Sequence, residues 1–95
     1  MNYSYNTNKT EIKDNGDDYI AQFELAGFSK KDLDVTATNS KLIIDAKNED
    51  RQSHFKLNLY GIVSIENIVS NMKNGLLTVT LPKKSVIGKR KIEVI

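Results

Sequence analysis

Few side chains in this sequence could carry out chemistry. The 95 residues include one histidine, His54, and no cysteine, which excludes disulfides, thiol catalysis and cysteine-ligated metal sites. A serine–histidine–acid triad would have to use His54, and no nucleophile-elbow motif accompanies it. On the polar face of an alternating segment, a lone imidazole is usually just solvated. We therefore predict no catalytic residue, and a protein that is not an enzyme.

The densest acidic cluster is Asp14-Asn15-Gly16-Asp17-Asp18, which has the residue types of a calcium loop. Its glycine stands at the third position instead of the sixth, and Leu25 occupies the place of the bidentate glutamate. The cluster is therefore predicted to be a hairpin turn with no metal. The five glycines of the chain are too scattered for a phosphate-cradling loop, so no cofactor is expected.

The positive charge is concentrated near the carboxyl end. Residues 1–50 carry six Lys and ten Asp or Glu, a net charge of −4, whereas residues 51–95 carry eight Lys or Arg and two Glu, a net charge of +6. No aromatic residue is interleaved in the basic segment to stack on bases, so no nucleic-acid partner is expected. We expect this segment to be solvated or to contact protein, because an acidic half can attract a basic one. The basic residues are Lys83, Lys84, Lys89, Arg90 and Lys91.

Length and composition place the chain among ordinary globular domains. It is 39% apolar and 27% charged, and 95 residues suffice for one modest core. No apolar run approaches the roughly 20 residues of a membrane helix, so no membrane span is expected. The first residues, 1–5, have neither the basic nor the apolar part of a secretory signal, which makes the cytoplasm the expected location.

The elements that must position any site are short strands. Residues 1–8 are predicted to form a flexible arm, residues 9–82 a single sandwich domain and residues 83–95 a basic tail. Apolar residues alternate with polar ones in Tyr19–Leu25, Leu33–Thr38, Leu42–Ala46 and His54–Leu59, a period that predicts β-strands. Further strands are predicted at Lys9–Asp14, Ile68–Lys73 and Leu76–Leu81. Pro82 is expected to end the pairing.

The segments between the strands contain turn signals. Ser29 is expected to cap a single helical turn, Asn48–Ser53 to be a charged loop, and Tyr60–Asn67, which fits neither period, a mostly irregular connection. Seven or eight short strands predict an all-β, antiparallel immunoglobulin-like sandwich, with a barrel as the alternative. Its predicted core is Phe23, Leu25, Val35, Leu42, Ile44, Leu57, Leu59, Ile68, Leu77, Val79 and Leu81.

Two segments carry the most specific pattern of the chain. In Leu25–Val35 a strand ends at Ala26-Gly27 and is followed by a lysine–acid pair and a new strand, and Asn74–Lys84 joins a turn, a strand, Pro82 and two lysines. In this order and spacing the two segments resemble the small heat-shock proteins. Leu25–Val35 then has Ala26 in place of the usual proline, and Asn74–Lys84 resembles the end of the family's alpha-crystallin domain. Lys91–Val94 echoes its carboxy-terminal Ile-x-Ile/Val anchor. The matching family residues are Gly27, Asn74, Gly75, Leu77, Val79, Leu81 and Pro82.

The resemblance implies an ATP-independent chaperone, a holdase that binds unfolding or aggregation-prone client proteins and assembles as a homodimer or larger homo-oligomer. It also implies that Ile92 and Val94 form an anchor. The groove receiving this anchor would lie between strands Leu33–Thr38 and Ile68–Lys73, with Leu33, Val35, Ile68 and Ser70 as its residues. A CS-type co-chaperone or a structural sandwich without holdase activity is the alternative.

The sequence also departs from the family. Only eight residues separate Ala46 from Phe55, which is too few for the loop and exchanged strand that commonly join two family subunits. A dimer is therefore expected to form by direct antiparallel pairing of a strand edge, formed by His54, Phe55, Lys56, Leu57 and Asn58. Because the arm is short and polar, the chain is expected to be either a trimmed core domain or a minimal member.

Overall fold

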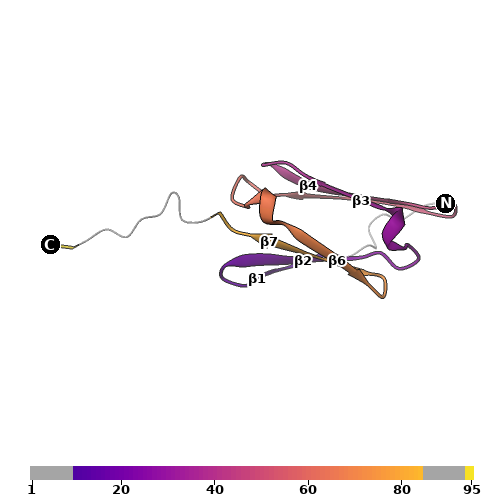
Figure 1. Cartoon of the computed structure of the whole chain (residues 1–95), viewed down its shortest axis with the longest axis horizontal. Helices are drawn as coiled ribbons and strands as arrows, with labels where there is room; N and C mark the ends of the chain where they lie inside the picture. The colour runs from indigo at the N-terminus through magenta and orange to yellow at the C-terminus, as the bar shows by residue number, and fades with distance from the viewer. Residues whose placement is uncertain (1–9, 85–93) are drawn as a thin grey trace.

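Two antiparallel sheets face each other in the computed structural model, which describes residues 10–84 and 94–95 (Figure 1). One sheet has the order β1-β2-β7-β6 and the other the order β3-β4-β5. The predicted all-β sandwich is confirmed, and the barrel alternative is not, because the two sheets stay separate. The strands are β1 (Thr10–Asp14), β2 (Asp18–Glu24), β3 (Leu33–Ala37), β4 (Lys41–Lys47), β5 (Gln52–Asn58), β6 (Val69–Lys73) and β7 (Leu76–Pro82).

The connections follow the turn chemistry of the sequence. At Asp14–Asp18, the Asn15 N–H donates to the Asp18 carbonyl over 2.8 Å and the Gly16 N–H to the Asp14 carboxylate over 2.9 Å. This segment is the predicted hairpin turn. Ser29 caps the single 3₁₀ turn η2 (Lys30–Asp32) in a capping box with Asp32.

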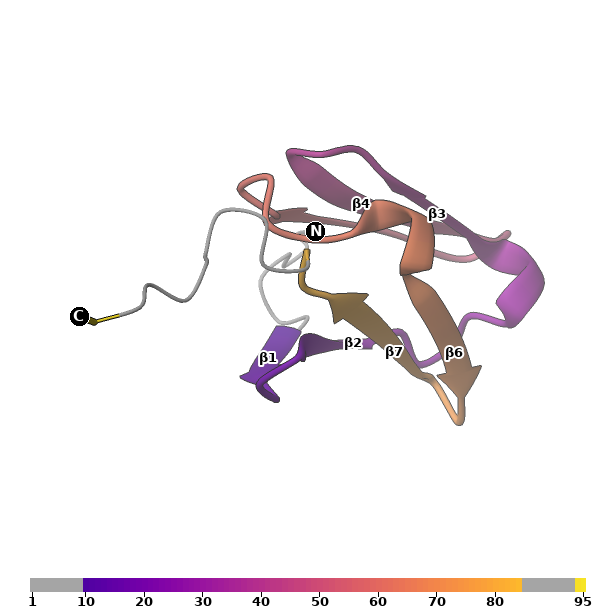
Figure 2. The ribbon, with the colours of Figure 1, turned by 60° about the vertical axis from the view of Figure 1, so that its left-hand side comes forward.

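The connection at residues 60–67 is less irregular than expected. It contains the 3₁₀ turn η3 (Ile65–Asn67), which lies beside the three-stranded sheet before the chain enters β6 (Figure 2). Pro82 is the last residue of β7, but the pairing continues for one residue, because Lys83 bridges Val63. Pro82 has no N–H to donate to the opposite Ser64 carbonyl, but that carbonyl accepts a hydrogen bond from the Asn67 N–H at 3.0 Å, and the Pro82 carbonyl accepts one from the Ser64 N–H at 2.8 Å.

The alternation of apolar and polar residues along the predicted strands identified most of the core. Eight of the predicted core side chains are buried: Phe23, Leu25, Leu42, Ile44, Leu59, Leu77, Val79 and Leu81. Phe23 and Phe55 pack edge to face across the two sheets, with ring centroids 5.1 Å apart. The inner faces of the strands therefore form the core, as the period-two pattern predicts.

Three predicted core residues, Val35, Leu57 and Ile68, are only half-buried. Val35 and Leu57 lie on strands at the edges of the three-stranded sheet, and Ile68 immediately precedes the edge strand β6. A side chain at such an edge is covered by neighbours on one side only. The alternation therefore predicts correctly that it lies on the inner face of the sheet, but it overestimates how deeply the side chain is buried. The rest of the core consists of Ala21, Ala46 and Phe55 on the predicted strands and of two buried residues outside them, Phe28 and Val63.

Within the described residues, no helix is long and apolar enough to cross a membrane.

Candidate functional site

One open side of the sandwich lies between β3 and β6, which are edge strands of opposite sheets. Two hollows of about 400 and 250 Å³ meet there, and Val35 and Ser70 line both. We call this continuous depression the β3–β6 groove. Leu33 lines the smaller hollow and Ile68 the larger. The structure therefore brings together the four residues for which the sequence predicts a receiving groove.

The floor of the groove is apolar and its rim is polar. Leu33, Val35 and Ile68 are half-buried against the core, whereas Lys30 and Glu66 contribute charge at the rim. A half-buried aliphatic floor between two strand edges that no described residue pairs can take up the side chains of an extended apolar segment.

The acidic residues near β3 have separate environments. The Asp32 carboxylate accepts hydrogen bonds from the Ser29 N–H over 2.8 Å and from its hydroxyl over 3.2 Å, and the backbone bond is the main reason why the pKa of Asp32 is lowered. Asp34 lies opposite Asp45 of β4 and is exposed. Asp34 is thus the more available partner for a basic segment.

The predicted dimer edge lies on β5, the other edge of the three-stranded sheet. Phe55 is buried and Leu57 half-buried, while His54, Lys56 and Asn58 are exposed. His54 Nδ1 lies 2.6 Å from the Asp45 carboxylate, and both side chains are 54% exposed. His54 is therefore engaged in a surface contact with β4.

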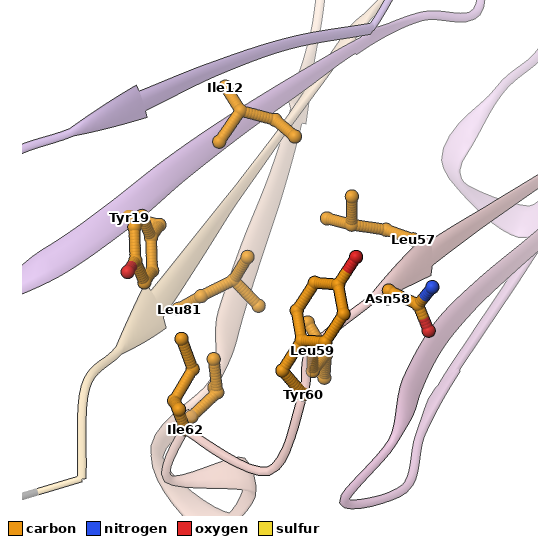
Figure 3. Close-up of a pocket in the computed structure, with 9 residues that line it drawn as sticks. Ile12, Tyr19, Leu57, Asn58, Leu59, Tyr60, Ile62 and Leu81 are labelled. Carbon is orange, nitrogen blue, oxygen red and sulfur yellow. The ribbon is translucent and has the colours of Figure 1, made fainter.

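Between β1 and β5 lies a larger hollow, of about 500 Å³, which the sequence did not predict. We call it the β1–β5 hollow. Three of its lining side chains are unusually exposed for apolar residues: Tyr60 at 76%, Ile12 at 51% and Ile62 at 44%. Figure 3 shows Ile12 and Tyr19 facing Leu57 and Tyr60 across it. The only sequence signal was the presence of Tyr60 and Ile62 in a segment that fits neither period.

Lys83 fixes the start of the tail beside this hollow. Its Nζ donates to the Asp14 carboxylate over 2.8 Å and lies 4.7 Å from the centroid of the Tyr19 ring. Its backbone N–H donates to the Asp17 carbonyl over 3.0 Å. The hydrogen bond between the two side chains lowers the pKa of Asp14 and raises that of Lys83. The root of the tail is thereby tied to the β1–β2 hairpin.

One of the two predicted anchor residues lies outside the described residues. Ile92 lies outside the described residues, and Val94, which is described, is 91% exposed. The pairing of Ile92 and Val94 with a groove stays a prediction.

The two family-like segments meet in space. The Leu25 N–H donates to the Gly75 carbonyl over 2.7 Å, and a Cβ on Gly75 would lie 3.1 Å from the Ala26 Cα. Asn74 and Gly75 have φ values of 52° and 78°, so both take the left-handed conformation of a tight hairpin turn. The arrangement requires a residue without a side chain at position 75.

The comparison with protein families decides the family. The model of the Hsp20/alpha crystallin family matches residues 11–95. The chain belongs to this family. Membership of this family favours the small heat-shock interpretation over its alternative, the CS-type co-chaperone.

Individual relatives of this chain are also named small heat shock proteins. Small heat shock protein C4 of Rickettsia felis is 28% identical over 90% of this chain, and small heat shock protein C3 of the same organism is 31% identical over 97% of it. The chain spans 63% and 53% of the lengths of these two relatives.

Solved structures share the fold. A small heat-shock protein from Xylella fastidiosa superposes with a TM-score of 0.76 over 96% of this chain and 98% of its own, at 20% identity. Heat shock protein 16.0 from Schizosaccharomyces pombe gives a TM-score of 0.74 over 93% of this chain and 75% of its own, at 25% identity. The sandwich is therefore of the alpha-crystallin domain type.

Proposed function

We propose that this chain is an ATP-independent holdase that captures exposed apolar segments of unfolding proteins and so prevents their aggregation. The β3–β6 groove is the observation that carries the proposal, because its apolar floor lies between the edge strands β3 and β6 of the two sheets. Capture lowers the free concentration of aggregation-prone chains by binding alone. The mechanism involves no catalysis and no cofactor, and the expected location is the cytoplasm.

The test is light scattering of a heated model client with and without the chain. We expect suppression by the wild type and a clear loss of suppression by Ile68→Thr, since Ile68 lines the groove. The matched control is Val69→Thr at the next position, where the side chain is 61% exposed and outside the groove. Absence of suppression by the wild type at several-fold excess would instead favour an interaction domain without holdase activity.

The same groove is the proposed receiver of the tail anchor of a neighbouring subunit. Ile92 and Val94 are two residues apart and would project to one side of an extended segment. Residues 83–91 would span about 30 Å when extended, enough to reach a neighbour. Replacing Ile92 and Val94 by Ala is expected to shrink any assembly larger than a dimer. An unchanged particle size in light scattering would exclude the anchor.

The dimer is proposed to form by antiparallel pairing of β5 with β5 of a second copy. Pairing two identical edges closes the assembly and removes both free edges. Lys56→Pro is expected to abolish the dimer and leave the domain folded. A dimer that persists in sedimentation of this variant would rule the edge out.

A further inference from the structure

Sulfur is scarce in this chain. The sequence contains no cysteine and two methionines, Met1 and Met72. Met1 lies outside the described residues, so Met72 holds the one sulfur atom of the part of the chain that the structure describes. Thiols and thioethers are the side-chain groups that oxidants convert stepwise to oxygen-bearing products. Oxidation of sulfur within residues 10–84 can therefore occur at Met72 only.

Met72 belongs to the floor of the β3–β6 groove. It lines the smaller hollow, of about 250 Å³, together with Leu33 and Val35. Its side chain is half-buried and packs against the core. On β6 it lies opposite Leu77 of β7, which is buried and lines the same hollow. Met72 thus contributes a thioether to a floor whose other apolar side chains are aliphatic.

A small oxidant can reach this side chain. Within the described residues, β6 is an edge strand that pairs with β7 alone, and Met72 is only half-buried. A water molecule takes up about 30 Å³ of the liquid. The hollow of about 250 Å³ therefore has room for hydrogen peroxide, which contains one oxygen atom more than water. Susceptibility of a sulfur side chain to oxidation rises with this kind of exposure.

The reaction of a thioether with hydrogen peroxide needs no further reagent. A lone pair of the Met72 sulfur attacks one peroxide oxygen, the O–O bond breaks, and the departing hydroxide takes up the proton of the transferred oxygen. The products are one methionine sulfoxide and one water, so the sulfur loses two electrons and the peroxide gains them. The change turns a flexible apolar side chain into a polar one, and sulfoxide reductases reverse it.

A sulfoxide at position 72 would change what the groove can hold. An apolar side chain seated in the smaller hollow would have to displace water from the new S–O group without offering it a hydrogen bond, and burying an unpaired polar group is costly. The larger hollow would keep its apolar character, because Ile65 and Ile68 line it and Met72 does not. Oxidation is thus expected to weaken binding in the groove without abolishing it.

We propose that Met72 is a site of reversible oxidation by peroxides, and that its sulfoxide weakens the binding of apolar segments in the β3–β6 groove. This inference rests on the proposed function and adds a regulation of the same groove. The tail anchor of a neighbouring subunit and the apolar segments of clients would both bind less tightly to the oxidised chain.

A peptide with the sequence of residues 89–95 is a suitable probe, because it contains no sulfur and oxidation then acts on the chain alone. Its dissociation constant is measured by fluorescence anisotropy before and after treatment of the chain with hydrogen peroxide, and mass spectrometry counts the added oxygens at each methionine. We expect one oxygen on Met72 and a dissociation constant about tenfold larger. Treatment with both methionine sulfoxide reductases should restore the original value.

Three variants separate the role of Met72 from other effects of peroxide. Met72→Leu keeps the size and apolar character of the side chain, so its binding should equal that of the wild type and should not change with peroxide. Met72→Gln, with a polar side chain of similar length, should bind weakly without peroxide. Met1→Leu is the matched control, and it should lose binding on oxidation as the wild type does.

The remaining outcomes contradict the inference. A sulfoxide on Met72 with an unchanged dissociation constant would show that the groove tolerates it, and a Met72 that stays reduced while Met1 is oxidised would show that peroxide does not reach it. Equal weakening of Met72→Leu would place the effect elsewhere, and loss of the circular dichroism signal on oxidation would mean unfolding in place of a local change.

Failure of the proposed function has a different signature. Aggregation suppression is measured on the reduced and the oxidised chain in parallel with peptide binding. A reduced wild type that neither binds the peptide nor suppresses aggregation contradicts the proposed function, and the regulation is then excluded with it. A reduced chain that is active, and whose activity in both assays is insensitive to oxidation of Met72, contradicts the regulation alone.

Discussion

At the scale of single residues, glycine positions show what the sequence could and could not reveal. The Asn74-Gly75 pair signals a tight turn by itself, and the structure confirms it with two positive φ values. The close approach of Gly75 to Ala26 joins segments about fifty residues apart. No local pattern contains such a contact, because it depends on how the two sheets are assembled.

Gly75→Ala is therefore predicted to destabilise the fold more than Gly16→Ala. Both glycines have positive φ, so both variants incur a cost of about 1–2 kcal/mol for a Cβ in the left-handed region. At Gly75 the new Cβ would also lie 3.1 Å from a backbone carbon, whereas at Gly16 nothing lies within 4 Å. Urea unfolding measures the difference. Equal losses of stability would show that the backbone at residues 25–28 shifts without measurable cost to make room for the new Cβ at position 75.

The contact between Asp14 and Lys83 predicts a pH dependence. The folded protein lowers the pKa of Asp14, mainly through the Lys83 hydrogen bond, so this contact stabilises the fold above the ordinary aspartate pKa of 3.8 and is lost as the pH falls through the lowered value. Lys83 has a raised pKa, so its contribution is complete at neutral pH and is lost only at strongly alkaline pH.

Asp14→Asn should accordingly reduce stability at pH 7 and approach the wild type at acidic pH. The measurement is the free energy of unfolding of both proteins across the acid range. Asp50→Asn, an exposed carboxylate in another turn, is the control. A difference for Asp14→Asn that stays constant with pH would mean that the lost contact is not electrostatic.

At the scale of elements, alternation identified the strands and most inward positions. It failed where burial depends on what a neighbouring sheet covers, as at Val35, Leu57 and Ile68. It also missed Phe28 and Val63, which lie in connections between strands and are buried in the core. Periodicity describes one element at a time, so it cannot find a side chain whose burial is decided by the packing of two sheets.

The core strand β7 should dominate stability. Leu77 and Val79 are 2% and 0% exposed, and β7 pairs with both β2 and β6. Truncating Leu77 to Ala should cost about 2–4 kcal/mol, because the rigid surroundings leave a cavity. Val69→Ala, on the exposed face of β6, should change stability by less than about 0.5 kcal/mol. Similar losses for both variants in chemical denaturation would contradict the assigned core.

At the scale of the whole molecule, the sequence predicted one open side of the sandwich and missed the other. The β3–β6 groove followed from the family resemblance, whose two segments fix the order of the strands. The β1–β5 hollow depends on Tyr60 and Ile62, in a connection without periodicity, and on the distant Ile12. The two sheets of the described residues leave the sandwich open on two sides. Apolar side chains line both of these open sides.

The charge asymmetry between the two halves leads to a final prediction about assembly. A peptide with the sequence of residues 89–95 combines three basic residues with Ile92 and Val94, and it would meet Asp34 and Glu66 near the β3–β6 groove. Each exposed ion pair contributes under about 1 kcal/mol, whereas burying each aliphatic side chain contributes about 1.5–3 kcal/mol. The apolar contacts should therefore dominate binding.

Titration of the chain with this peptide, followed by fluorescence anisotropy, can separate the two contributions. Raising the salt from about 0.1 M to about 1 M shortens the Debye length from about 10 Å to about 3 Å, which should weaken binding only a few-fold. A peptide with Ala at both anchor positions should lose binding at either salt concentration. If salt abolishes binding while the Ala peptide still binds, attraction between the basic tail and the acidic half holds subunits together, and the groove then remains available to clients.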